Sequence, residues 1–494
     1  MPGLWGRKNL DLLRSEAEES ENGLRRTLGP VALMSLGIGA IVGAGIFVLS
    51  GVAAQHTGPA LVLSVILSGV GCAFAGLCYA EFAAMIPVAG SAYTYSYATI
   101  GEFLAWIIGW DLILEYAVGA TTVCIGWSGY FVSFLQKTLH LPFPAALSRS
   151  PWETVLLDDG TRVRAFFNLP AAFIIALITT LLIIGIRESA NFNNLIVMVK
   201  VCVVVLFILV GAFFVHRVYW HPFFPANQGT FGDFGFSGVL RGAGIIFFAY
   251  IGFDAVSTAA QEARNPERDM PIGILGSLGI CTVLYIVVVM VLTGLLPFRQ
   301  LNVADPLAVA IDSTPAHAWL SPIVKIGALL GTTAVILVMM LGQTRVFYSM
   351  AHDGLLPKAF GRVHKRFRTP YLSTALTGAC VAVAGGLLPL RVVGELVSIG
   401  TLLAFVIVSA SVMVMRKRHP DIRRPFRTPW VWLVGPLSIV VCGGQMLGLP
   451  RDTWIRLFVW MGLGLIVYFT YSRFHSTLRQ TTSGVQQTKN GVRA

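Results

Sequence analysis

The chain has 494 residues, of which 55% are hydrophobic and only 12% are charged, and its formal net charge is +12. Soluble domains carry roughly 25% charged residues, so this composition, with a mean hydropathy of +0.73, excludes an ordinary soluble protein. Long apolar runs recur from residue 30 to residue 472. Each reaches the roughly 20 residues that a helix needs to cross a bilayer. The sequence therefore predicts an all-α polytopic membrane protein.

About twelve transmembrane helices are predicted within one membrane domain over residues 29–475. Residues 1–28 are polar and charged, which indicates a cytoplasmic N-terminal arm and no cleavable signal peptide. Residues 476–494 are also polar and predict a disordered cytoplasmic tail. The expected spans are 30–54, 58–84, 102–134, 167–186, 190–215, 235–260, 272–296, 320–344, 370–390, 393–415, 430–448 and 453–472.

Basic residues are distributed unevenly between the two sets of loops. The N-terminus, the even-numbered loops and the tail hold 24 Lys and Arg residues, the odd-numbered loops hold nine, and three lie within spans. Because cytoplasmic loops carry the basic excess, this bias predicts that both termini are cytoplasmic. Topology, with some attraction to anionic membrane lipid, explains the positive charge, and we expect no nucleic-acid partner.

The first span contains four glycines between Gly37 and Gly45, in LGIGAIVGAGIF, although each glycine weakens a helix by about 1 kcal/mol relative to alanine. The sixth span, GAGIIFFAYIGFD, is the other glycine-interrupted one. Paired interrupted spans in two halves indicate a transporter site built from inverted repeats. Glycine spacings also let helices pack closely. Gly37 and Gly39 fit either interpretation, whereas Gly43-Ala44-Gly45 favours unwinding.

Several ionisable side chains fall inside spans, where they are costly and mark pathways or couplings. Asp111 and Glu115 lie one turn apart in GWDLILEY. Lys200 lies about 15 Å into the fifth span at 1.5 Å per residue, too deep for a lysine that reaches the interface. Asp254 follows the sixth-span interruption, where we favour a scaffold role, accepting bonds from freed amides, over a proton relay. For Glu115 we favour a functional role, and the alternative is a carboxylic acid bonded to a neighbouring helix.

Loops and cysteines add little chemistry. Asp-Gly in VLLDDGTRV predicts a small hairpin outside the membrane, and residues 299–318 predict a short external helix. All seven cysteines lie in apolar segments, which argues against a disulfide framework or a metal site. No GxxxxGK[ST], GxSxG or HExxH motif is present. We therefore expect no enzyme activity, no cofactor and no ATP coupling.

At GAIVGAGIFVLSG, GWDLILEY and FFAYIGFDAVSTAAQEARNPERDMPIGI, the sequence resembles the cationic amino acid transporter branch of the amino acid–polyamine–organocation superfamily. The similarity covers about residues 24–475. It implies a leucine-transporter-like fold, with a five-plus-five inverted repeat over about 30–215 and 235–415 and two extra helices over about 430–472. It also implies that an amino acid is held between broken first and sixth spans.

A broken helix suits a zwitterion, whose two charges are costly to strip of water unless paired. The break frees amides at one half-helix start and carbonyls at the other half-helix end, which suit a carboxylate and an ammonium respectively. The resemblance places the substrate carboxylate on the amides of Gly43, Ala44 and Gly45. It places the ammonium on the carbonyls of Ile41, Phe248, Ala249 and Ile251.

The resemblance also gives roles to buried side chains. Lys200 would put its ammonium between the first and eighth spans, where sodium-coupled relatives bind a cation, and would couple transport to a proton. Glu115 would meet the cationic side chain of arginine or lysine. Tyr250 and Phe253 could gate or line the pocket, although packing is equally compatible with both.

Together these features predict a secondary active amino acid transporter, a proton symporter of the plasma (inner) membrane. The alternatives are an amino acid or polyamine exchanger, a sodium-coupled symporter using Thr332-Thr333, and a receptor that senses amino acids without transport. Both cationic and small neutral substrates are compatible with the sequence, and a small accessory membrane subunit is left open.

Overall fold

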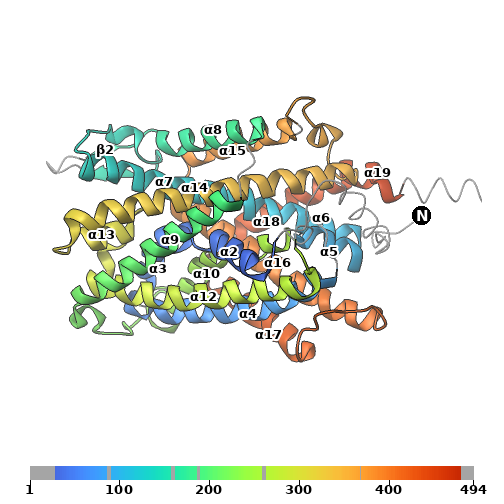
Figure 1. The fold of residues 1–494 in the computed structure, drawn as a ribbon, viewed down its shortest axis with the longest axis horizontal. Coiled ribbons are helices and arrows are strands. Elements are labelled where there is room, and N and C mark those ends of the chain that lie inside the picture. The colour runs from blue at the N-terminus through green and yellow to red at the C-terminus, as the bar shows by residue number, and fades with distance from the viewer. Residues whose placement is uncertain are drawn as a thin grey trace, which may run out of the picture.

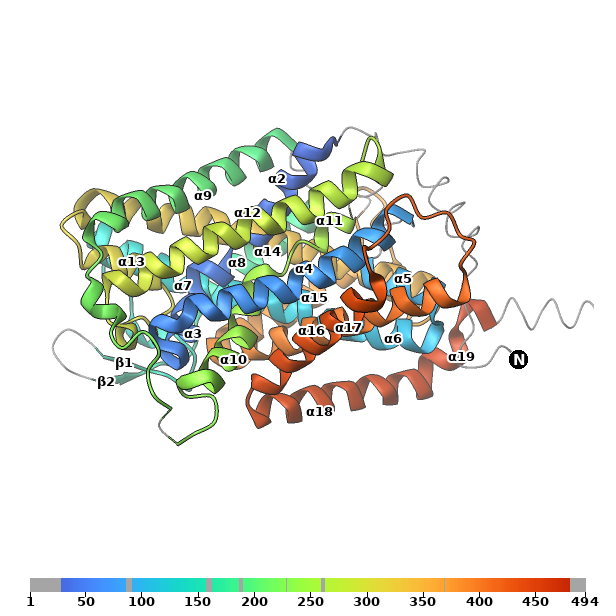
Figure 2. The same ribbon diagram turned by 90° about the horizontal axis from the view of Figure 1, so that it is seen from below.

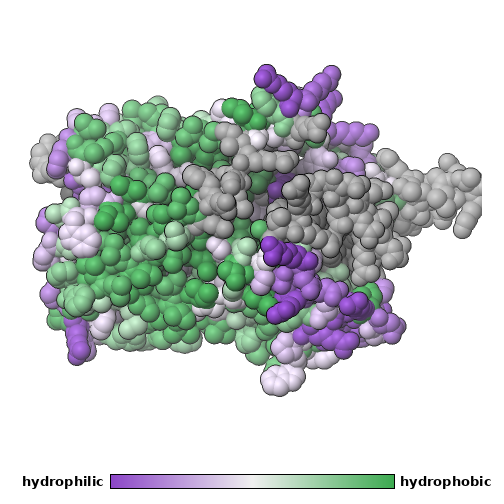
Figure 3. Space-filling model, in the orientation of Figure 1, coloured by the Kyte–Doolittle hydropathy of each residue, from purple (hydrophilic) through white to green (hydrophobic). Residues whose placement is uncertain are grey.

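The computed structural model describes residues 28–85, 91–156, 162–185, 190–227, 229–258, 263–367 and 369–479. Most of its long helices run along one axis of the molecule (Figures 1 and 2). Figure 3 shows a broad hydrophobic region over the middle of one face and hydrophilic residues toward both ends of that axis. A helical bundle that crosses a bilayer has this distribution, because its backbone polar groups are satisfied within the helices.

The predicted helical spans are confirmed. Eight helical segments in the described ranges are long and apolar enough to cross a membrane, and three shorter apolar helices accompany them. One of the eight, Pro30–Met85, contains both the first and the second predicted span. All twelve predicted spans therefore have helical counterparts, and the chain is a multi-pass membrane protein.

The first span consists of α2 (Pro30–Ile41), η1 (Gly45–Leu49) and α3 (Ser50–Thr57). The next elements are α4 (Leu61–Met85), α5 (Ser91–Thr99), α6 (Glu102–Ile113), η3 (Leu114–Val118), α7 (Gly119–Ser133), η4 (Phe134–Thr138), α8 (Leu169–Ile184) and α9 (Ala190–Gly211).

The sixth span consists of α10 (Gly235–Ile246), η8 (Phe247–Tyr250) and α11 (Ala255–Thr258). The helices after the sixth span include α12 (Pro266–Leu295), α14 (His317–His352), η11 (Lys358–Gly361), α15 (Tyr371–Leu387), α16 (Leu390–Arg418), α17 (Val431–Gly448), α18 (Arg451–Val467), η12 (Tyr468–Ser472) and α19 (Arg473–His475).

The interrupted first and sixth spans lie among the other helices. α12 packs against α4 and α2, and α9 packs against α2, α12 and α14. α8 and α15 form a contacting pair along one side of the bundle (Figure 1). Each broken span is therefore in contact with continuous helices that can bond its freed backbone groups.

Two features outside the spans match the sequence. β1 (Thr154–Leu156) pairs antiparallel with β2 (Arg162–Arg164), so the strands flanking the predicted Asp-Gly turn form a hairpin, while the turn itself lies outside the described residues. The predicted external helix is present as η10 (Phe298–Gln300) and α13 (Pro306–Asp312).

Two segments differ from the predicted boundaries. α5 occupies a stretch that we expected to be loop, because its sequence SAYTYSYAT is too polar to be recognised by hydropathy. Its Tyr93 donates a 2.7 Å hydrogen bond to Asp353 at the end of α14. α12 begins at Pro266, before the predicted 272, with proline in the first turn, where its missing N–H costs nothing.

The two ends of the described chain lie at the same end of the molecule (Figure 1). Leu28 accepts a 2.8 Å backbone bond from Arg264, just before α12. The first residues of the predicted tail dock on Glu102, which accepts hydrogen bonds from Ser476 and, at 3.0 Å, from Arg479. Residues 1–27 of the predicted arm and 480–494 of the tail lie outside the described residues.

At the opposite end, the loop before α13 fits against two glycines. A Cβ on Gly51 of α3 would meet the Leu301 carbonyl oxygen, and a Cβ on Gly129 of α7 would meet the Ala304 side chain. Asp305, in the same loop, is only 9% exposed. Burial raises the pKa of its carboxyl to about 6, although the Ser133 hydroxyl and nearby lysines act in the opposite direction.

We expect Asp305→Asn to remove a pH dependence of stability that the wild type shows between about pH 4 and pH 6. Raising the pKa from 3.8 to about 6 means that the folded state binds the proton more tightly, by about 3 kcal/mol. The wild type therefore holds this stabilisation below about pH 4 and loses it as the pH rises through about 6. Asparagine cannot ionise. The melting temperature of the variant should therefore exceed that of the wild type, by a margin that grows as the pH rises toward neutral.

Thermal melting of the purified full-length chain in detergent between pH 4 and pH 8 measures this difference. Glu153→Gln, which removes a partly buried carboxylate at the same end, is the control and should leave the wild-type profile unchanged. Parallel pH profiles for wild type and Asp305→Asn would contradict the prediction.

Candidate functional site

The first span is interrupted at its centre, as predicted. α2 ends at Ile41, Val42 has an extended backbone with ψ 94°, and helical structure resumes with η1. The amides of Gly43, Ala44 and Gly45 find no acceptor among the described residues, and all three residues are buried. Buried amides are nearly always paired in proteins, so this cluster of free donors fits an anionic ligand group.

The sixth span is interrupted at nearly the same depth of the fold. η8 ends at Tyr250, and Ile251 is extended with ψ 134°. Gly252 has φ +121°, a conformation that side-chain-bearing residues rarely adopt. Helical structure resumes at Ala255. Both predicted interruptions are therefore confirmed, while their roles in binding stay predictions.

The two interruptions touch each other. A Cβ on Gly45 would lie 2.7 Å from the backbone nitrogen of Ala249, and a Cβ on Gly252 would lie 2.7 Å from the carbonyl carbon of Ala40. The backbones could not approach this closely if either glycine had a side chain. Gly37 and Gly39, which fitted either interpretation, lie inside α2 and pack against neighbouring helices.

Carbonyl groups of the two breaks share one side chain that the sequence analysis missed. The Tyr285 hydroxyl of α12 lies 2.8 Å from the Ile41 oxygen and 3.0 Å from the Ala249 oxygen. A hydroxyl has one proton, so it can donate to only one of them at a time. The Phe248 oxygen accepts a 3.2 Å bond from the Ile251 amide. The signal for Tyr285 was a phenol deep inside an apolar span, which requires a polar partner.

Lys200 is completely buried, at 0% exposed. Its ammonium donates a hydrogen bond to the Gly39 oxygen in α2. Its side-chain Cδ lies 3.4 Å from the position of a Cβ on Gly331 in α14. The side chain therefore lies between the first and eighth spans, where the resemblance implied that it would be.

Asp254 connects the sixth-span break to the third span. One carboxylate oxygen accepts a 3.1 Å bond from the Gly252 amide, and the other accepts a 3.2 Å bond from the Tyr116 hydroxyl. This arrangement fits the scaffold role. Glu115 is 1% exposed and lies beside Asp254. No described residue donates a hydrogen bond to its carboxyl oxygens.

The two aromatic residues of the sixth-span break point into packed surroundings. The Tyr250 hydroxyl donates a 2.9 Å bond to the Val65 oxygen of α4. The Phe253 ring lies 5.0 Å from the ring of Phe405 and 5.7 Å from that of Tyr79, measured between centroids. These contacts favour packing over gating for both residues.

The alternative sodium ligands bond to their own helix. The Thr332 hydroxyl donates to the Ala328 oxygen at 2.5 Å, and the Thr333 hydroxyl donates to the Leu329 oxygen at 2.7 Å. Within the described ranges, no group of three or more His, Cys, Asp or Glu residues is arranged to hold a metal ion.

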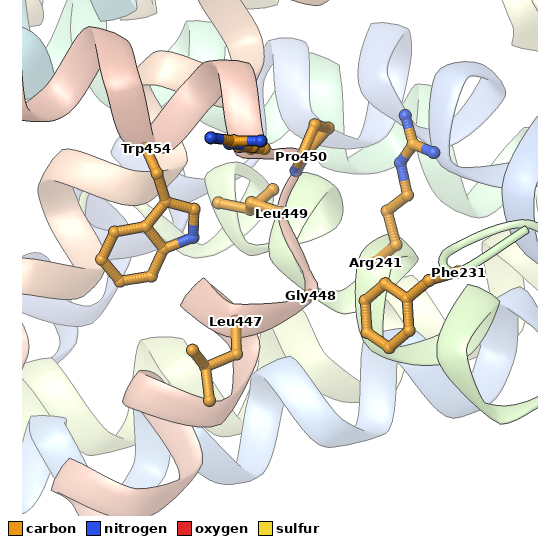
Figure 4. A pocket seen from close by; sticks show the side chains of 8 residues that line it. Phe231, Arg241, Leu447, Gly448, Leu449, Pro450 and Trp454 are labelled. Carbon is orange, nitrogen blue, oxygen red and sulfur yellow. The ribbon is translucent and has the colours of Figure 1, made fainter.

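Three cavities lie away from the breaks. One of about 900 Å³ is lined by the loop around Asp305 and by α7, and one of about 700 Å³ lies at the start of α12. The third, of about 570 Å³, surrounds the turn between α17 and α18 (Figure 4). The residues of the two breaks that we propose to bind substrate (the cradle residues: Ile41, Gly43, Ala44, Gly45, Phe248, Ala249 and Ile251) are themselves buried.

Comparison with known proteins identifies the family. The model of the amino acid permease family matches residues 28–474. The chain is 45% identical to a methylthioribose transporter of Bacillus subtilis, over 97% of this chain and 100% of the relative. It is 46% identical to a branched-chain amino acid permease of the same organism, over 94% of this chain and 97% of the relative.

A more distant relative is the vacuolar cationic amino acid transporter 4 of Arabidopsis thaliana, 36% identical over 85% of this chain and 68% of the relative. These relatives carry the names of transporters and permeases, not of enzymes. The chain belongs to the amino acid permease family of the amino acid–polyamine–organocation superfamily.

Proposed function

We propose that this protein imports an amino acid across the plasma membrane by proton symport, with both termini in the cytoplasm. The observation that carries the proposal is the set of three buried amides without acceptors at Gly43, Ala44 and Gly45, directly beside carbonyls of the same break and of the sixth span. Donors and acceptors in one buried place match the carboxylate and ammonium of a zwitterion. The excess of basic residues in one set of loops supports the orientation.

The substrate ammonium would bond the same Ile41 and Ala249 oxygens that the Tyr285 hydroxyl contacts. Each carbonyl oxygen has two lone pairs, so an ammonium can be added while the hydroxyl stays or moves aside. In the empty carrier the hydroxyl limits the cost of burying these oxygens. Tyr285 would thus stabilise the state without substrate.

Lys200 would couple the proton. Its ammonium bonds the Gly39 oxygen, so loss of its proton would weaken this charge-assisted bond to α2 just before the break. The Lys200 side chain lies between α2 and α14 and puts a charged amine where a sodium ion would otherwise lie. This favours the proton over sodium as the coupling ion. The self-bonded hydroxyls of Thr332 and Thr333 are in line with this preference.

Methylthioribose is a second candidate substrate, because a relative 45% identical to this chain is named for its transport. This thiosugar offers hydroxyl groups and a thioether but neither a carboxylate nor an ammonium. Hydroxyls could bond the same amides and carbonyls, but neutral partners form weaker hydrogen bonds than charged ones. We therefore rank an amino acid first.

Competition in proteoliposomes tests the substrate class. We expect unlabelled alanine or leucine to inhibit uptake of the labelled amino acid, whereas the corresponding amide and decarboxylated amine should not, because each lacks one charge of the zwitterion. Arginine inhibition would extend the site to cationic side chains near Glu115. Methylthioribose uptake that no amino acid inhibits would overturn the amino acid assignment.

Lys200→Met should abolish stimulation of uptake by an inward proton gradient, because methionine has a similar length but carries no proton. The exposed loop variant Lys358→Met is the control and should respond as the wild type does. Uptake with and without the gradient, in sodium-free buffer, measures the effect. Gradient-driven uptake that survives in Lys200→Met, or uptake that requires sodium, would contradict proton coupling through this residue.

Tyr285→Phe should slow net uptake more than exchange. Without the hydroxyl, the empty carrier buries the Ile41 and Ala249 oxygens unpaired, which costs about 1–3 kcal/mol, or roughly fivefold or more in rate. Exchange avoids the empty state and should be affected less. Tyr250→Phe, whose hydroxyl bonds α4 instead, is the matched control. Equal losses of uptake and exchange in Tyr285→Phe would refute this role.

A further inference from the structure

A groove at the end of the molecule that carries both chain ends combines charged and apolar residues. It has a volume of about 700 Å³ and lies between the start of α12 and the loop from α16 to α17. Its polar lining includes Glu267, Arg268 and Arg423, and its apolar lining includes Ile272, Leu275 and Phe426. The groove shares no lining residue with the broken spans.

The polar and apolar parts of the groove lie at different depths. Leu275 follows Arg268 by seven residues on the same helix, which corresponds to about 10 Å along its axis. α12 is one of the helices long and apolar enough to cross a membrane, and Ile272 is 38% exposed on its surface. The arginines therefore lie near the membrane surface, and the apolar part continues into the bilayer.

The charges of the groove do not balance. Arg423 lies 3.2 Å from Glu267, in an ion pair whose side chains are 81% and 46% exposed. Arg268 is exposed, and its side chain has no ion pair or hydrogen bond among the described contacts. Two guanidinium groups against one carboxylate give the lining one net positive charge, which complements a ligand with a single negative charge.

We propose that this groove binds one anionic phospholipid, with its phosphate on Arg268 and Arg423 and its acyl chains along Ile272, Leu275 and Phe426. Arginine suits phosphate because its planar fork can donate two parallel hydrogen bonds. Basic pockets between membrane helices on the cytoplasmic side are suited to anionic head groups. A free phosphate would use only the polar half of the groove.

The bound lipid would connect two parts of the bundle. The loop that carries Arg423 is fixed to α4, because Glu81 accepts bonds from Arg416 at 2.7 Å and from the Thr428 amide at 2.8 Å. The other wall of the groove belongs to α12. A lipid that contacts both walls therefore stabilises the position of α12 relative to α4 and α16.

The groove at the opposite end of the bundle lacks this arrangement. Figure 4 shows Arg241 and Trp454 on opposite sides of the turn that contains Gly448 and Pro450. Arg241 is already paired, 3.3 Å from Asp233 and 3.9 Å from Glu395. Its charge is therefore compensated within the protein.

Native mass spectrometry of the detergent-purified full-length chain tests the proposal, with dioleoyl phosphatidylglycerol and dioleoyl phosphatidylcholine as probes. We expect phosphatidylglycerol to be retained over phosphatidylcholine and to raise the melting temperature. Arg268→Gln and Arg423→Gln should each weaken retention by about fivefold. Lys358→Gln removes a positive charge from another of the loops that carry the basic excess. This variant is the control and should retain phosphatidylglycerol as the wild type does.

Two further comparisons separate the possible sources of binding. Arg268→Lys keeps the charge and should retain most phosphatidylglycerol even if a neutral variant folds poorly. Phe426→Ser should weaken phosphatidylglycerol but leave inorganic phosphate unaffected. The proposal would be overturned if the two lipids were retained equally, or if Lys358→Gln lost as much lipid as the arginine variants do. Displacement of the lipid by millimolar inorganic phosphate would also overturn it.

Discussion

The close contact between the two interrupted spans determines the chemistry of this protein. Gly45 meets the backbone of Ala249, and Gly252 meets that of Ala40, with no room for a Cβ at either glycine. Neither glycine could carry a side chain here, and the polar groups at the crossing point are main-chain amides and carbonyls together with the Tyr285 hydroxyl. We propose that such a site recognises the groups that all α-amino acids share.

The same contact creates a problem of unpaired backbone groups inside a membrane, where each one is costly. Neighbouring helices supply the missing partners. Tyr285 from α12 can donate to a carbonyl of either break, Lys200 from α9 donates to the Gly39 oxygen, and the Asp254 carboxylate accepts from the Gly252 amide. The amides of Gly43, Ala44 and Gly45 have no acceptor among the described residues, which is why we propose that they contact the substrate.

Glycine patterns and hydropathy were enough to predict the spans and both breaks, because these are properties of local sequence. Partners across the fold were not predictable in the same way. Tyr285 looked like one more aromatic residue in an apolar helix, since nothing in the sequence reports its distance to Ile41 and Ala249. Glu115 lies beside Asp254, a contact that depends on how the third and sixth spans pack, and its expected role toward the substrate side chain stays a prediction. α5 was missed because polar aromatic residues fill it.

The breaks also explain how a closed site can open. All cradle residues are buried, so substrate exchange requires one end of the bundle to move. A continuous helix would have to break backbone hydrogen bonds in order to bend, but no helical bonds cross Val42–Gly43 or Ile251–Gly252. Each half-helix can therefore tilt separately, at the cost of the contacts made by Tyr285, Lys200 and Asp254. Rocking of this kind around a fixed central site is how inverted-repeat transporters alternate access. We propose that the glycines that weaken the first span as a helix also allow it to act as a hinge.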